Sequence, residues 1–501
     1  MVKSQLGEIR LRPSGWAKNS SVGISVLFLF ILPILFGSYS LILERYRLIN
    51  EKIEKKPVLK EKNPSRYNYH PPIKIEGNWE AVSTATNENW PGNGTLASPY
   101  VIQNYNITTR PSMDWGDVLI GITDTDLYFI IRNCFLKGGY IGIRLDNASG
   151  VQISNNVLIN NYASVELSSV GKNEILNSSI IECRGNGVFL LYSGKSSIRG
   201  NKFSDILGTA ISLWNSGGSI ISHNIIASIW GDGISLRTSG NNTIINNVLL
   251  NRGITISGSS ISDFIQNLVD NNTLNGKFLV YMQNLDGVTV PMDAAQVAMV
   301  NCTNIILESR YLSNVSIGAL VAFSSGIEIV RNVISNNIRI GISLINVTKC
   351  VISDNIIILN HGDGIKLYKS TDCLITNNTF TQNVQRGISL FYSQGNSITW
   401  NKFIENSRGT VSQAFDDSNR NTFAYNYWND WISPDLNQDG LVDLPYAVDG
   451  HTDNQDRFPR TSPTGRLSEG PDFRFMIVSA LIVTIAVLLI LPRVKIRLFG
   501  D

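Results

Sequence analysis

Oxygen-bearing side chains recur at alternate positions between residues 435 and 443 of this 501-residue chain. In the numbering of a calcium-binding loop they take positions 1, 3, 5 and 9, position 6 is a glycine, and position 7 offers a backbone carbonyl. Because alternate side chains of such a loop converge on one cation, the segment predicts a calcium site. The ligands would be Asp435, Asn437, Asp439, Asp443 and the carbonyl of Leu441.

Position 12 of this loop departs from the EF-hand pattern, because Tyr446 stands where a bidentate glutamate belongs. Asp449 or Asp453 would have to complete the coordination shell. The alternative interpretation is a solvated polar turn.

A second group, His361, Asp363 and Lys366, is the densest set of polar side chains in the chain, and a local base could be built from it. Acid–base catalysis on a saccharide, however, needs two or three converging carboxylates. Asp232 occupies the same position of the repeat described below, but six coils away, about 29 Å at ~4.8 Å per coil. The sequence therefore shows no catalytic pair and no converging Asp/Glu and Lys/Arg on neighbouring coils.

A third group shares one position of the repeat, three residues after the apolar member of each Gly-Ile pair. Stacked on neighbouring coils, such side chains would offer flat faces to sugar rings, although aromatic residues also favour strand faces for packing alone. The candidate ligand-binding residues are Trp214, Arg237, Tyr368 and Phe391.

The element that must position these groups is a repeat of about 23 residues. Gly341, Gly364 and Gly387 each precede an Ile, and asparagines recur at the same step from Asn332 to Asn401. Apolar residues alternate over three to five positions, which is typical of short strands, and no helical run of ten residues occurs between residues 71 and 426.

Three short strands per 23-residue coil predict an all-β fold, a parallel β-helix of about 13 coils over residues 71–426. Ile, Leu and Val would fill its bore, and one Asn per coil would bond its equivalents above and below at a tight corner. The repeat is irregular between residues 254 and 320, which predicts a modified coil with a protruding loop.

Two uncharged apolar runs, residues 22–43 and 475–491, have about the length of a membrane-spanning helix. Arg493, Lys495 and Arg497 follow the second run, which favours a cytoplasmic C-terminus and places residues 44–474 outside the cytoplasm. The first run is expected to be an uncleaved signal anchor rather than a removed signal peptide. The remaining segments are an N-terminal cytoplasmic tail (1–21), a charged stalk (44–70), a C-terminal cap (427–460), a linker (461–474) and a basic cytoplasmic tail (492–501).

The composition narrows the classes of ligand. A net charge of +2 with 16% charged residues gives no reason to expect nucleic acid. Five scattered cysteines predict buried thiols rather than disulfides, with Cys350 and Cys373 one coil apart. The four histidines and six methionines are scattered, so no copper site is expected.

Three passages carry a resemblance to a known family. They are residues 92–95 with 99–102 (Gly-Asn-Gly-Thr and Pro-Tyr-Val-Ile), the segment 276–303, and Asn426-Tyr-Trp with Asp439-Gly and Leu444-Pro-Tyr. Over residues 71–460 the chain resembles the NosD-type right-handed parallel β-helix surface proteins, which are common in archaea and are also described as periplasmic copper-binding proteins. The resemblance implies a right-handed β-helix, carbohydrate-related roles in many relatives, and an accessory role in copper-enzyme maturation in the name-giving branch.

Together these features predict a membrane-anchored, extracytoplasmic β-helix that binds glycans or other cell-surface polymers, or that serves as a structural element of the envelope. One alternative is a polysaccharide lyase, epimerase or hydrolase of the β-helix class. The other is an accessory protein of copper-enzyme maturation.

Overall fold

The computed structural model describes residues 66–109, 117–409, 411–451 and 453–463. Both predicted spans, 22–43 and 475–491, lie outside these residues, as do the two predicted cytoplasmic tails. Among the described residues, no helix combines the length and the apolar character needed to cross a membrane.

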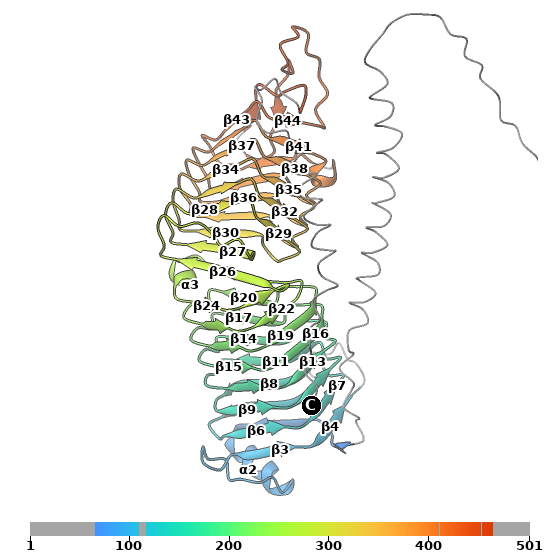
Figure 1. The fold of residues 1–501 in the computed structure, drawn as a ribbon. Coiled ribbons are helices and arrows are strands. Elements are labelled where there is room, and N and C mark those ends of the chain that lie inside the picture. Colours follow the sequence, from blue (N-terminus) through green and yellow to red (C-terminus); the bar gives the residue numbers. More distant parts are fainter. Residues whose placement is uncertain (1–65, 110–116, 410, 452, 464–501) are drawn as a thin grey trace, which may run out of the picture. The chain divides into compact units, whose positions relative to one another are not determined.

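The described chain winds into a parallel β-helix, as predicted (Figure 1). Successive coils add one strand to each of three faces, in register and almost always parallel. We call the face whose strands follow the Gly-Ile motif the front sheet. Its N-terminal part consists of β2 (Ile73–Glu76), β5 (Val118–Thr125), β8 (Ile141–Ala148), β11 (Ala163–Ser168), β14 (Val188–Leu191), β17 (Ile211–Trp214), β20 (Ile234–Arg237) and β23 (Ile254–Ser257).

The strands that follow the front strands in the N-terminal coils form the side sheet. They are β3 (Tyr100–Gln103), β6 (Phe129–Arg132), β9 (Val151–Ser154), β12 (Glu174–Leu176), β15 (Ser197–Arg199), β18 (Ile220–Ser222), β21 (Thr243–Ile245) and β24 (Leu268–Asp270). The third face consists of β1 (Asn68–Tyr69), β4 (Tyr105–Thr108), β7 (Phe135–Lys137), β10 (Val157–Ile159), β13 (Ser179–Ile181), β16 (Lys202–Ile206), β19 (Ile225–Ile229), β22 (Val248–Leu249) and β25 (Thr273–Leu274).

The C-terminal coils repeat the arrangement. Their Gly-Ile strands, which we call the C-terminal front sheet, are joined through β26 to β25, so they continue the third face as one 16-stranded sheet. They are β26 (Lys277–Gln283), β27 (Ala294–Val300), β30 (Ala319–Ala322), β33 (Ile342–Ile345), β36 (Ile365–Tyr368), β39 (Ile388–Phe391) and β42 (Ala414–Asp416). A second sheet contains β28 (Ile306–Glu308), β31 (Glu328–Val330), β34 (Val351–Ser353), β37 (Leu374–Thr376), β40 (Ser397–Thr399), β43 (Thr422–Ala424), β45 (Tyr446–Ala447) and β46 (Gln455–Asp456). A third contains β29 (Tyr311–Ser313), β32 (Val333–Ser335), β35 (Ile356–Ile358), β38 (Thr379–Thr381), β41 (Lys402–Ile404) and β44 (Tyr427–Trp428).

Inward side chains stack as columns along the bore. Val188, Ile211 and Ile234 occupy one register position of β14, β17 and β20, and all three are fully buried. Alternation of inward and outward side chains along each short strand is what fixes this register. The five cysteines are buried free thiols, as predicted.

The asparagine ladder is also present, and it satisfies backbone groups at a corner of the coil. Asn355 donates its backbone N–H and its Nδ2 to the Oδ1 of Asn378, which does the same to Asn401. The left-handed backbone expected at this corner belongs to the preceding residue, as at Asn377 (φ 56°), and not to the ladder residue itself. A short polar side chain tolerates that conformation at the least cost.

The irregular segment predicted at residues 254–320 joins the two halves. After β25 the chain reverses at Gly276 (φ 80°), so that β26 pairs antiparallel with β25 and parallel with β27. The side-chain amide of Gln296 then makes the hydrogen bonds that a backbone peptide group makes between regular coils. It accepts the N–H of Ile254 (3.0 Å) and donates to the carbonyls of Ile254 (2.8 Å) and Ile317 (3.0 Å). Two short turns, α3 (Ser262–Ile265) and η2 (Asn406–Gly409), complete the secondary structure of this solenoid.

Both ends of the described solenoid are covered. Helix α2 (Gly77–Asn87) follows β2 and buries Ala81 and Ala85. The sequence analysis missed this helix, because two alanines give it little apolar periodicity. At the other end, the rings of Phe403, Trp428 and Tyr446 stack face to face, with centroids 4.2 and 4.0 Å apart.

Candidate functional site

The N-terminal front sheet carries a cluster of charges on its outer face. Arg144 in β8 and Glu166 in β11 are register partners, with Nη2 and Oε2 3.9 Å apart, and both side chains are about one quarter exposed. Burial raises the pKa of Glu166, the Arg144 guanidinium opposes this shift, and the negative charge of Asp146 adds to it. Two carboxylates and one guanidinium therefore meet on neighbouring coils.

This cluster corrects the expectation that no converging Asp/Glu and Lys/Arg exist. The sequence reasoning missed it because it compared positions at a step of 23 residues, whereas Arg144 and Glu166 are 22 residues apart. The signal that could have found it is the shorter coil, in which Ile143 pairs with Val165.

Aromatic rings continue the same face. Phe189 takes the register position of Glu166 in the next coil, and its ring meets the Trp214 ring edge-on at 5.4 Å. The guanidinium of Arg237 lies 4.8 Å from the centroid of Trp214, a cation–π distance. Trp214 remains 40% exposed, so its indole is available to a ligand.

The C-terminal front sheet carries a second aromatic group. Tyr368 and Phe391 are register partners in β36 and β39, the Lys366 ammonium lies 4.7 Å from the Phe391 ring, and Phe391 contacts Phe415 at 5.0 Å. The junction at β26 separates this group from Trp214 and Arg237. The four predicted ligand-binding residues thus form two pairs in two different sheets, one in each half of the solenoid, instead of one ladder.

Asp363 lies beside this second aromatic group and is 5% exposed. Its Oδ1 accepts the backbone N–H of Arg386 at 3.1 Å. Burial raises the pKa of Asp363, while that N–H, the Ser389 hydroxyl and the positive charges of Lys366 and Arg386 oppose the shift. The positive charge of Lys366 therefore acts on the Asp363 carboxylate.

The imidazole of His361 does not join them: it is exposed and makes no hydrogen bond or ion pair with any described residue. Asp232, at the equivalent position of an N-terminal coil, is engaged at the junction. Both of its oxygens accept from Arg339, at 2.9 and 3.2 Å, and Oδ2 also accepts from Thr255 at 3.0 Å. Asp232 is 1% exposed, so this pair is structural.

The predicted calcium loop is compact and exposed. The two oxygens of Asp435 accept the N–H groups of Asp439 and Gly440, at 3.2 and 3.0 Å, and Oδ2 of Asp443 accepts that of Leu436. Oδ1 of Asn437 also accepts from Asp439. The chain thus curls around these oxygens.

Tyr446, at position 12 of the loop, is buried in the aromatic stack, so it cannot be a ligand. Across the described ranges, no group of three or more His, Cys, Asp or Glu side chains is placed to hold a metal ion.

The histidines and cysteines do not fit a copper site. His223, His361 and His451 are exposed on separate coils, and His70 pairs with Glu88 at 3.3 Å. Cys350 and Cys373 are in contact in the bore, where their mutual hydrogen bond and burial raise the pKa of Cys350. Copper(I) prefers clustered Cys, Met or His, and within the described residues no third Cys or His joins this pair of thiols.

Solved structures with likeness to this chain are β-helix proteins of several activities. The A-module of the mannuronan C-5 epimerase AlgE6 from Azotobacter vinelandii is 12% identical and is matched over 70% of this chain and 94% of its own (TM-score 0.27). The catalytic domain of a GH87 α-1,3-glucanase in complex with nigerose is 13% identical over 71% and 69% (TM-score 0.29). An alginate lyase from Paenibacillus sp. is 12% identical over 62% and 94% (TM-score 0.25). These likenesses carry no argument about the activity of this chain.

No curated protein matches the chain. One family model does, that of the periplasmic copper-binding protein NosD, and it covers residues 93–260 and 264–446. The match spans both halves of the solenoid, includes the junction and ends in the cap, as the resemblance of the three sequence passages implied. The periplasmic description of the family also agrees with a β-helix outside the cytoplasm. The chain therefore belongs to the NosD family of periplasmic β-helix proteins.

Proposed function

We propose that this protein is an extracytoplasmic β-helix, held at the membrane by its two apolar segments, that binds glycans or other cell-surface polymers along the front sheet. The observation that carries the proposal is the set of rings beside charged groups on the front strands of both halves of the solenoid. Rings flanked by cations offer apolar and polar contacts together. Since the face repeats at each coil, ~4.8 Å apart, it suits a ligand that is itself a repeat.

The test is binding of purified full-length protein to a glycan array, followed by titration of the best ligand. Trp214→Ala and Tyr368→Ala should each weaken binding by about 2- to 10-fold, the range of one aromatic contact. The matched control is Trp79→Ala, since Trp79 is 83% exposed but lies on helix α2 and not on a strand of the front sheet. Equal affinity of all three variants and the wild type would contradict the proposal.

The charge cluster favours a second candidate, a polysaccharide lyase, epimerase or hydrolase. Glu166, with its raised pKa, is suited to give or take a proton, and Arg144 is suited to hold an anionic substrate. Glu166→Gln should abolish turnover and leave polymer binding intact, measured as new reducing ends for a hydrolase or as unsaturated products for a lyase. Glu182→Gln, an exposed glutamate elsewhere, is the control.

We also propose that the loop at residues 435–443 binds calcium. The support is the spacing of its oxygens and the backbone that curls around them. Bound calcium would order the cap over the last coils.

A further inference from the structure

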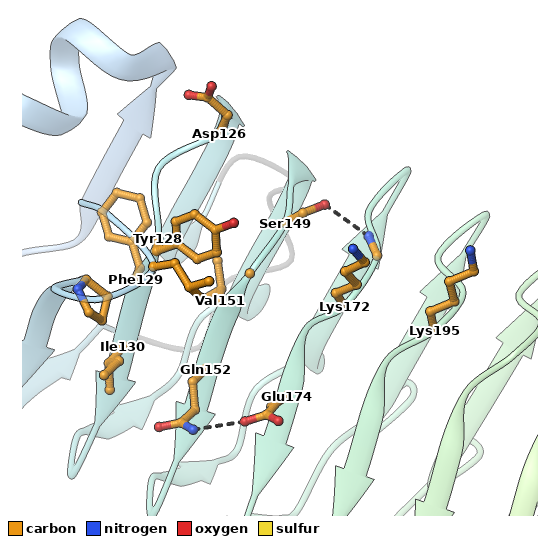
Figure 2. Close-up of a pocket in the computed structure, with 14 residues that line it drawn as sticks. Asp126, Tyr128, Phe129, Ile130, Ser149, Val151, Gln152, Lys172, Glu174 and Lys195 are labelled. Atoms are coloured by element: carbon orange, nitrogen blue, oxygen red, sulfur yellow. Dashed lines mark hydrogen bonds between the residues drawn. The ribbon is translucent and has the colours of Figure 1, made fainter.

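A pocket of about 750 Å³ lies over the corner between the N-terminal front sheet and the side sheet (Figure 2). This volume is within the usual range of small-molecule sites. Its walls come from consecutive coils, so residues from β6, β9 and β12 and from the loops before them face one space. None of the groups on the front sheet discussed above lines it.

One wall of the pocket depends on Gly150, because the ring of Tyr128 occupies the space that a side chain at position 150 would take. The Tyr128 ring approaches Gly150 so closely that a Cβ there would stand 2.5 Å from the ring, and Gly150 adopts φ 77°. Only glycine meets both conditions without strain. Gly171, in the next coil, donates its N–H to the Ser149 hydroxyl at 3.2 Å, and this hydrogen bond links the two corner loops. The Tyr128 ring therefore forms a flat, rigid wall, and Figure 2 shows it facing the space in front of Ser149.

Two cations stand at one end of this wall. Lys172 and Lys195 occupy the same position of neighbouring coils, two residues before the register partners Glu174 and Ser197. Both are exposed, and Figure 2 shows their side chains extending side by side. Neither ammonium group forms an ion pair within the described part of the chain.

Each carboxylate of the pocket accepts a hydrogen bond from a neutral amide and keeps its negative charge. Oε2 of Glu174 accepts from Nε2 of Gln152 at 2.9 Å, and Oδ1 of Asp126 accepts from Nδ2 of Asn78 at 2.6 Å. The Tyr128 hydroxyl makes no hydrogen bond with any residue that the structure describes. The pocket thus offers two unpaired positive charges, one free hydroxyl and apolar surface from Leu96, Pro99 and Val151.

We infer that this pocket binds an acidic oligosaccharide, with a carboxylate or sulfate group between Lys172 and Lys195 and a sugar ring against Tyr128. A small inorganic anion would use only the lysines and leave the ring wall unoccupied. A neutral sugar would use only the wall and leave like charges facing each other in neighbouring coils. The inference concerns a different sheet from the proposed polymer-binding face and does not depend on it.

The probes are trigalacturonate and its fully methyl-esterified form, which differ in charge but not in the sugar, together with sodium sulfate. Titrated against full-length protein at low ionic strength, trigalacturonate should bind at least about 10-fold more tightly than the ester or sulfate, and added salt should remove most of that difference. Lys172→Gln and Lys195→Gln should each weaken trigalacturonate binding about 3- to 5-fold, the range of one exposed charge contact. Tyr128→Leu should weaken it as well.

The matched control is Lys349→Gln, because Lys349 is an exposed lysine at a left-handed corner (φ 54°) outside the pocket. Its affinity for trigalacturonate should equal that of the wild type. Equal binding of acid and ester, sulfate binding as tight as that of the trisaccharide, or wild-type affinity in both pocket-lysine variants would overturn the inference.

Discussion

The side chains of the asparagine ladder join neighbouring coils by hydrogen bonds, and each amide makes several of them. Asn378 accepts two hydrogen bonds from Asn355 and donates to Asn401 and to the carbonyls of Ile352 and Thr376. All of these groups lie away from water, where an unpaired polar atom is expensive. The corner is therefore specified by one residue type, which is why the ladder was visible in the sequence.

Replacing Asn378 by Leu should lower the free energy of unfolding by about 3 kcal/mol or more, because several buried partners lose their bonds together. The measurement is chemical denaturation of the full-length protein. Asn419→Leu is the control, since Asn419 is exposed and outside the ladder, and it should change the midpoint little. Equal midpoints for both variants would mean that the ladder bonds contribute no net stability.

Asp456 takes the ladder position beside the last coil, where its Oδ2 accepts from Asn426 and from the Trp428 indole. Burial raises its pKa above the usual 3.8. The folded protein therefore binds a proton on Asp456 more tightly than the unfolded chain does. The stability that this protonation contributes is complete below pH about 4 and is lost as the pH rises through the folded-state pKa of Asp456.

Asp456→Asn keeps the accepting Oδ2 and never ionises, but it loses the hydrogen bond that the N–H of Phe458 donates to Oδ1. The Tm of the variant relative to that of the wild type should therefore rise from pH about 4 to pH 7, by about 1 °C per kcal/mol that the wild type loses over this range. Thermal melts between these pH values measure it. A difference that grows towards low pH would mean that the carboxylate is the stabilised form.

At the scale of strands and loops, the repeated coils could be predicted from the sequence, whereas the features that occur once were missed. Period-2 alternation and the 23-residue step located the coils, because both follow from backbone geometry alone. The Gln296 bridge and the Arg144–Glu166 pair were missed, since each depends on contacts across coils of unequal length. The pocket beside Tyr128 was missed for the same reason: its walls come from five coils. Helix α2 was missed because its two buried alanines give little apolar periodicity.

The loop at residues 435–443 is where the sequence pattern and the structure lead to one decisive experiment. If its oxygens bind calcium, the ion should raise Tm by mass action at micromolar to millimolar concentrations, and EDTA should reverse the effect. Asp439→Ala should abolish the difference between calcium and EDTA, whereas Asp205→Ala, an exposed aspartate far from the loop, should preserve it. Melting curves that stay the same up to about 10 mM calcium would favour a polar turn.

For the whole molecule, the predicted arrangement places the entire solenoid outside the cytoplasm. A membrane-impermeant amine reagent applied to intact cells should therefore label exposed lysines of the β-helix such as Lys172, Lys195 and Lys349, identified by mass spectrometry of the peptides. A cytoplasmic protein should stay unlabelled in the same cells. Labelling of these lysines only after lysis would place the solenoid inside.

The register of the C-terminal coils has a consequence for how such a chain evolves. Residues 365–387 make one full turn between the paired strand starts Ile365 and Ile388. A duplication of this stretch would add one strand to each of three sheets and would extend the columns and the asparagine ladder without a new kind of contact. Gene duplication can thus lengthen the molecule in steps of ~4.8 Å, so that solenoid length becomes an inherited trait on which selection can act independently of the fold.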